Sequence, residues 1–93
     1  MIREVRISRP AEKQLRRVPL HVAEKLQVWA ELVCTDGLEN VRKIPGYHDE
    51  ALRGKRRGQR SIRLSRAYRA IYEQLTDGTL EFVSVEEVSK HEY

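Results

Sequence analysis

The sequence predicts an α+β domain: an N-terminal strand, a two-helix hairpin, and then a twisted antiparallel sheet of three to four strands. Three observations carry this prediction. Residues 2–8 alternate and are rich in β-branched side chains, residues 10–35 show helical apolar spacing, and residues 59–88 hold three strand-like segments with a turn between the last two. We expect residues 1–93 to form one domain, because a chain of this length suffices for a single small core.

Prolines and a glycine mark the limits of the two helices. Ser8 followed by Pro10 is typical of a helix start, and this helix must end before Pro19, because proline disfavours helical geometry in the preceding residue. Pro19 opens a longer helix at about residues 20–35, and Gly37 ends it. Its apolar side chains recur at helical spacing and predict a buried stripe of Val22, Leu26, Trp29 and Val33.

Cys34 lies in the same helical stretch, and we expect a buried structural thiol there. The three histidines show no metal-ligand spacing with this single cysteine, so we expect neither a metal nor any small-molecule cofactor. No apolar segment approaches the ~20 residues of a membrane span. The first residues alternate charged and apolar side chains, unlike a signal peptide. We therefore expect a cytoplasmic protein without a membrane partner.

The second half of the chain predicts the antiparallel sheet. Residues 37–50 have the composition of a loop with one helical turn, and a short strand is expected near residues 51–53. Longer strands are expected at residues 59–65, 68–75 and 80–88. Asp77-Gly78, between the last two of these, is a strong hairpin signal.

Charge is distributed unevenly along the chain, which has a net charge of +4. Residues 1–50 carry nine basic and eight acidic side chains, whereas residues 51–72 carry eight basic and no acidic ones. Residues 73–93 carry one basic and six acidic ones. A basic block of this density on one surface suits a large anion, and nucleic acid is the foremost candidate. The alternative is a solvated charged face.

Strand alternation indicates which of these cations act together. Ile62 and Leu64 face one side of the predicted strand, so Arg63 faces the other side. Arg69 lies on the neighbouring strand, where cross-strand residues approach within about 5 Å, and the two arginines are expected to grip one phosphate. The remaining cations are expected to contact RNA around them: Arg53, Lys55, Arg56, Arg57, Arg60 and, near the end of the chain, Lys90.

Candidates for proton transfer flank the basic block. The closing Lys90-His91-Glu92-Tyr93 continues a predicted strand beside the arginines. His91 is a natural proton donor or acceptor near neutral pH, and Tyr93 can stack on an exposed base. Glu50 precedes the basic strands and is the candidate general base, although nearby arginines lower the pKa of such a carboxylate. The alternatives are a frayed terminus and a polar loop.

Four motifs in order resemble one protein superfamily: Glu50-Ala-Leu-Arg-Gly, Arg60-Ser-Ile-Arg-Leu, Ala67-Tyr-Arg-Ala-Ile-Tyr72 and Lys90-His-Glu-Tyr93. They resemble the RelE/ParE toxins of bacterial toxin–antitoxin pairs, and are most similar to the RelE/YoeB-type mRNA interferases. The element order of nearly the whole chain fits this resemblance. In YoeB-like proteins, however, the histidine directly precedes the terminal tyrosine, whereas here Glu92 intervenes.

The resemblance implies an endoribonuclease that cleaves mRNA on the ribosome without a metal. The ribose 2′-hydroxyl would attack the adjacent phosphate, with Glu50 removing its proton. Arg63 and Arg69 would stabilise the transition state. His91 or Lys90 would protonate the leaving oxygen, and Tyr93 matches the family's terminal tyrosine.

The resemblance also implies a cognate antitoxin protein as partner, acidic or amphipathic, that covers the basic face. Two other functions remain open from the sequence. One is a ParE-like inhibitor of DNA gyrase, which shares the fold but needs no His/Tyr tail. The other is an RNA-binding domain without catalysis.

Overall fold

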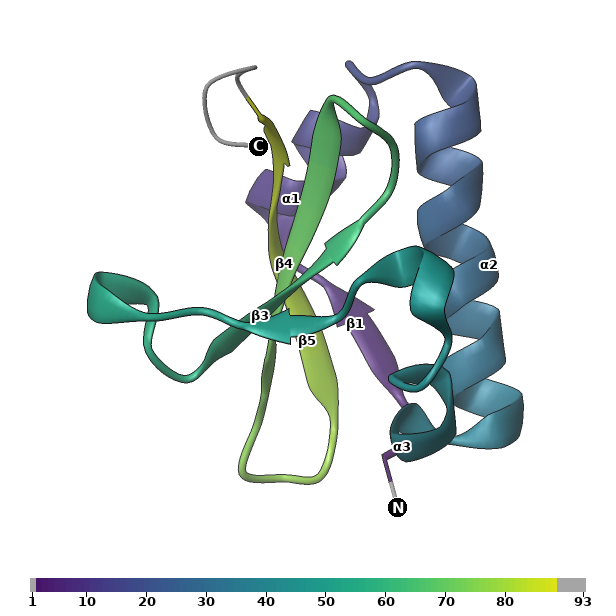
Figure 1. Cartoon of the computed structure of the whole chain (residues 1–93), viewed down its shortest axis with the longest axis vertical. Coiled ribbons are helices and arrows are strands. Elements are labelled where there is room, and N and C mark those ends of the chain that lie inside the picture. The colour runs from purple at the N-terminus through teal and green to yellow at the C-terminus, as the bar shows by residue number, and fades with distance from the viewer. Residues whose placement is uncertain (1, 89–93) are drawn as a thin grey trace.

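The structure, a computed structural model, describes residues 2–88 (Figure 1). Its elements follow in the order β1 (Val5–Ile7), α1 (Arg9–Leu15), α2 (Leu20–Asp36), α3 (Leu38–Val41), η1 (Pro45–Tyr47), β2 (Glu50–Ala51), η2 (Gly54–Arg56), β3 (Gln59–Arg63), β4 (Tyr68–Gln74) and β5 (Leu80–Glu87). The predicted α+β class and the predicted order of elements are confirmed. The short helices α3 and η1 occupy the segment that was expected to be a loop with one helical turn.

The strands form one five-stranded sheet in the order β1-β5-β4-β3-β2. The four strands β2 to β5 pair antiparallel, as the sequence predicts. The N-terminal strand joins the same sheet as its other edge and pairs parallel with β5, with Val5 opposite Leu80 and Ile7 opposite Phe82. Residues from both ends of the described chain therefore lie side by side.

Strand β1 is much shorter than β5, and side chains of the following segment take over its hydrogen bonds. The Ser8 hydroxyl donates to the Val83 carbonyl and also accepts from the Ala11 N–H, so it caps α1. Further along, the Val85 N–H donates to the Gln14 side chain at 2.7 Å. Backbone groups of β5 that have no strand partner are thereby satisfied, and α1 is fixed against the sheet.

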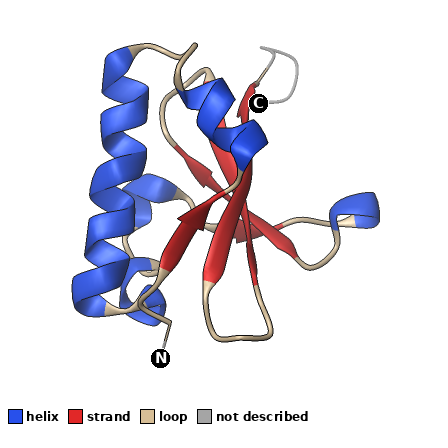
Figure 2. Ribbon diagram, turned by 180° about the vertical axis from the view of Figure 1, so that it is seen from behind, coloured by secondary structure: helices blue, strands red, loops and turns tan. Residues whose placement is uncertain are grey.

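The core lies between the helices and one face of the sheet (Figure 2). The predicted stripe of α2 is confirmed, because Val22, Leu26, Trp29 and Val33 are all buried. The Trp29 ring contacts the rings of Tyr72 and Phe82, with centroids 5.2 and 5.3 Å apart. Ala11 of α1 belongs to the same buried cluster, so α1 and α2 cover the same sheet face.

The prediction for Cys34 is wrong, because its side chain is exposed. It follows Val33 by about 100° around α2 and so leaves the buried stripe. There it borders an apolar groove between β1, α1 and α2 that is also lined by Ile7, Leu15 and Ala30. Within residues 2–88, no helix has the length and apolar character that a membrane span requires.

A β-bulge in the β4–β5 pair changes which side chains of β5 face the core. Tyr72 lies opposite Phe82, but the preceding Ile71 lies opposite Ser84, so β5 contains one extra residue. Phe82 and Val85, three residues apart, therefore both face the core. Glu86 consequently lies on the opposite face of the sheet, directly across from Arg69.

Candidate functional site

The sheet face opposite the core carries a row of three charged residues. Arg63 of β3 is the direct cross-strand partner of Arg69 of β4, and Arg69 is in turn the partner of Glu86 of β5. Arg63 and Arg69 are therefore neighbours on adjacent strands, as the sequence predicts. Directly opposed residues on adjacent strands lie about 5 Å apart at Cα, so the two guanidinium groups share one small region.

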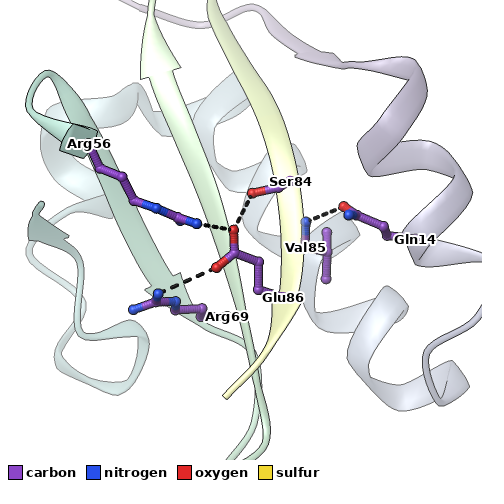
Figure 3. Close-up of polar contacts among 6 residues, drawn as sticks. All are labelled: Gln14, Arg56, Arg69, Ser84, Val85 and Glu86. Atoms are coloured by element: carbon purple, nitrogen blue, oxygen red, sulfur yellow. Dashed lines mark hydrogen bonds and ion pairs between the residues drawn. The ribbon is translucent and has the colours of Figure 1, made fainter. Parts of the chain in front are cut away.

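A third arginine, Arg56, reaches this row from η2 (Figure 3). Arg56 Nη2 donates to Glu86 Oε2 at 2.7 Å, and Arg69 Nη2 contacts Glu86 Oε1 at 3.4 Å. The Ser84 hydroxyl donates to Glu86 Oε2 at 3.0 Å. We call the surface formed by Arg56, Arg63, Arg69, Ser84 and Glu86 the basic face.

The Glu86 carboxylate is ionised at neutral pH. Its partial burial alone would raise its pKa, but hydrogen bonds from Arg56 and Ser84 and the positive charges of Arg56 and Arg69 outweigh that effect, so its pKa lies below the ordinary value. The basic face thus combines three guanidinium groups with one fixed negative charge. Sequence reasoning missed Glu86, since it counted this residue only as part of an acidic tail.

Arg69 keeps hydrogen-bonding capacity that the described residues do not use. Its Nε is buried and has no hydrogen-bond partner within residues 2–88. Its contact with Glu86 is long for a charge-assisted hydrogen bond, which is usually 2.7–2.9 Å. The Arg69 side chain remains about 31% exposed, so an anion from solvent can reach it.

The other predicted residues of the loop lie around the basic face. Arg53, Lys55 and Arg57 are exposed in and beside η2, between β2 and β3. Glu50 is exposed on the edge strand β2 opposite Ser61, which places it on the same sheet face as Arg63. Two strand spacings, about 10 Å, separate the backbones of β2 and β4.

Arg60 does not join the basic face. It lies on the opposite side of β3, where it pairs with Tyr72 across the strands. Arg60 Nε donates to Asp49 Oδ1 at 2.6 Å, and the Tyr72 hydroxyl donates to Asp49 Oδ2 at 2.7 Å. The Asp49 side chain is fully buried. Arg60 therefore compensates a buried carboxylate, and its predicted contact with RNA stays a prediction.

Lys90, His91 and Tyr93 lie outside the described residues, so their predicted roles stay predictions. No group of three or more His, Cys, Asp or Glu side chains within residues 2–88 is arranged to hold a metal ion. The chemistry available on the described surface is that of guanidinium groups, a hydroxyl and carboxylates.

The raised pKa of Tyr72 leads us to expect that the free energy of unfolding falls at high pH. Burial, together with the hydrogen bond to Asp49, raises the pKa of Tyr72 to about 12, against an opposing effect of Arg42. A phenol whose folded pKa exceeds its unfolded value of about 10 stabilises the fold fully below pH 10, and this contribution is lost as the pH rises toward 12. We expect a contribution of about 2 kcal/mol to disappear over that range.

The measurement is the free energy of urea unfolding at about pH 9 and about pH 11 for the wild type and Tyr72→Phe. The variant lacks the titrating phenol, so its stability should fall less with pH than that of the wild type. Equal pH slopes for the two proteins would contradict the assignment.

Comparisons with known proteins agree on the fold. No protein family model matches the chain, and no curated protein matches it in sequence. Solved structures do match. YafQ from E. coli has a TM-score of 0.66 and 24% sequence identity, over 91% of this chain and 92% of YafQ. RelE in the RelE–RelB complex from Pyrococcus horikoshii has a TM-score of 0.73 and 17% identity, over 97% of this chain and 99% of that one.

YoeB in the YoeB–YefM complex from Staphylococcus aureus has a TM-score of 0.69 and 16% identity, over 92% of this chain and 97% of YoeB. Each likeness extends over nearly the full length of both chains. The arrangement of strands and helices described above is therefore the fold that these proteins share.

Proposed function

We propose that this chain, which has the fold of the RelE/YoeB-type toxins, is the toxin of a type II toxin–antitoxin pair and cleaves mRNA on the ribosome. One observation carries this proposal most: Arg63 and Arg69 are direct cross-strand partners on the sheet face that the helices leave open. Guanidinium groups bind phosphate with well-defined geometry, and a close pair of them suits the phosphate of an RNA backbone.

The proposed reaction is attack of the ribose 2′-hydroxyl on the adjacent phosphorus. The 2′-oxygen forms a bond to phosphorus while the bond to the 5′-oxygen of the next nucleotide breaks, which gives a 2′,3′-cyclic phosphate and a free 5′-hydroxyl. Arg63 and Arg69 stabilise the negative charge that grows on the phosphate oxygens. This step needs no metal-activated water, because the nucleophile belongs to the substrate itself.

Two proton transfers complete the reaction. Glu50, exposed on the same sheet face, is the candidate that accepts the 2′-hydroxyl proton. His91 or Lys90 is the candidate that donates a proton to the departing 5′-oxygen, and Tyr93 is placed in this proposal to stack on a base. The ribosome supplies the alignment of the message, which the small exposed face cannot impose alone.

The proposed partner is a cognate antitoxin that covers the basic face. RelE and YoeB neighbours are known in complexes with RelB and YefM, and a strongly basic surface favours a partner with acidic side chains. Such a partner would block access of RNA to Arg63 and Arg69. The cytoplasm is the compartment where message, ribosome and antitoxin meet.

The proposal is tested by adding purified protein to a translation reaction and, separately, to a DNA gyrase supercoiling reaction. We expect primer extension to reveal new ends within the translated message, and we expect supercoiling to continue. An intact message combined with trapped gyrase–DNA complexes would instead support the gyrase inhibitor. An intact message with neither effect would leave only an RNA-binding domain.

A further inference from the structure

The Glu86 carboxylate lies where an external anion would be expected. It accepts hydrogen bonds from Arg56, Arg69 and Ser84 at 2.7, 3.4 and 3.0 Å (Figure 3). Two guanidinium groups and a hydroxyl are also the donors that proteins commonly direct at the phosphates of nucleic acids. The donor set around Glu86 is therefore suited to a phosphodiester as well as to a carboxylate.

The carboxylate fits this donor set unevenly. It lies close to Arg56 but far from Arg69, and the buried Nε of Arg69 has no hydrogen-bond partner among the described residues. A phosphate group is larger than a carboxylate and presents its oxygens in a tetrahedral arrangement. In place of Glu86, it can approach the exposed part of the Arg69 guanidinium group more closely than the carboxylate does at 3.4 Å.

Glu86 and Arg56 can separate from each other without unfolding of the protein. Glu86 is the penultimate residue of β5, and its side chain is about 26% exposed. Arg56 belongs to the short η2 turn, and its side chain is about 41% exposed. Both side chains are long and partly exposed, so rotation about side-chain bonds is enough to separate them.

We propose that Arg56, Arg69 and Ser84 form a phosphodiester-binding site, and that Glu86 occupies this site in the free protein until an RNA phosphate displaces it. The inference rests on the proposed function for the choice of RNA as ligand. Two anions cannot share the same donors at this distance, because like charges repel. Glu86 therefore weakens the binding of RNA to the free protein.

The test measures the binding of a single-stranded, 2′-O-methylated RNA oligonucleotide to the full chain by fluorescence anisotropy, without ribosomes. The modified RNA has no free 2′-hydroxyl, so it binds but cannot be cleaved. We expect Glu86→Gln to bind this RNA about tenfold more tightly than the wild type, because the competing charge is gone.

Glu87→Gln is the matched control. It removes the same charge from the adjacent position of β5, but successive side chains of a strand point to opposite faces, and Glu87 is exposed opposite Tyr68. We expect its RNA affinity to stay within about twofold of the wild type, apart from the general effect of net charge. Equal affinities of Glu86→Gln and Glu87→Gln, weaker binding by Glu86→Gln, or no binding by any variant would overturn the proposal.

A second measurement applies even if Glu86→Gln does not fold. In isotopically labelled wild-type protein, added RNA should shift the guanidinium NMR signals of Arg56 and Arg69 and the carboxyl signal of Glu86. Unchanged signals at saturating RNA would also overturn the proposal. Failure of the proposed function can be told apart from failure of this inference. A protein that shows the Glu86 effect but never cuts translated message would contradict the proposed cleavage and leave the phosphodiester-binding site supported.

Discussion

Replacing Arg69 with alanine is expected to slow cleavage of translated message by about 10²–10³-fold, the usual effect of losing a donor that stabilises transition-state charge. Arg69 occupies the centre of the charged row, with Arg63 on one side and Glu86 on the other. It also keeps unused donor capacity at its Nε. Arg69 is the residue of β4 that pairs with both Arg63 and Glu86 across the strands, so its loss leaves the centre of the row without a donor.

Two further variants test whether the rate depends on the positive charge of Arg69, on the geometry of its N–H donors, or on the loss of any exposed arginine. Arg69→Lys keeps the positive charge but loses the planar fork of N–H donors, so we expect an intermediate rate. Arg17→Ala removes an exposed arginine after α1, on the covered side of the sheet, and should cut at the wild-type rate. The rates are measured by primer extension with purified ribosomes. Cleavage by Arg69→Ala within threefold of that by Arg17→Ala would contradict the role of Arg69.

Replacing Asp49 with alanine is expected to lower the free energy of unfolding by about 3 kcal/mol. Its buried carboxylate accepts hydrogen bonds from Arg60 and from the Tyr72 hydroxyl, and both donors lose their partner in the variant. For a domain of this size, that loss corresponds to a fall in Tm of roughly 10–20 °C. The measurement is thermal and urea unfolding followed by circular dichroism.

An exposed ion pair supplies the control for this prediction. Arg6 and Asp77 form a pair at 3.0 Å in which both side chains are about half exposed. Exposed pairs are screened by solvent and contribute little, so Arg6→Ala should unfold at nearly the wild-type temperature. If Asp49→Ala were as stable as Arg6→Ala, the buried network would not be the structural support described here.

The same network gives Arg60 a partner that the sequence alone does not reveal. Alternation along β3 puts Arg60 on the same face as Ile62, but that fact alone does not reveal a partner. The partner, Asp49, lies eleven residues earlier, in the turn before β2, and meets Arg60 only after β2 and β3 pair. The arginines of residues 51–72 therefore have different surroundings in the fold. Arg60 pairs with the buried Asp49, whereas Arg56 and Arg69 belong to the basic face.

The fold itself was largely predictable, because its signals are local. Apolar spacing located α2, Ser8 and Pro10 located the start of α1, and Asp77-Gly78 located the last hairpin. The parallel pairing of β1 with β5 was not predictable in this way, since it joins segments about 75 residues apart.

The position of Glu86 depends on one extra residue in β5. Uninterrupted alternation from Phe82 would place Glu86 toward the core, which is implausible for a carboxylate. The bulge opposite Ile71 and Tyr72 reverses the alternation, brings Val85 into the core and directs Glu86 to Arg69. No glycine or proline in β5 indicates this bulge in the sequence. The position of Glu86 on the basic face can therefore be seen only in the structure.

In the proposed mechanism, the basic face promotes attack by the substrate's own 2′-hydroxyl. This mechanism is tested most directly by determining the chemical ends of message fragments produced by the purified protein on ribosomes. We expect a 2′,3′-cyclic phosphate on the upstream fragment and a 5′-hydroxyl on the downstream one, both absent with Arg69→Ala. A 3′-hydroxyl and a 5′-phosphate would require attack by water and would contradict this mechanism.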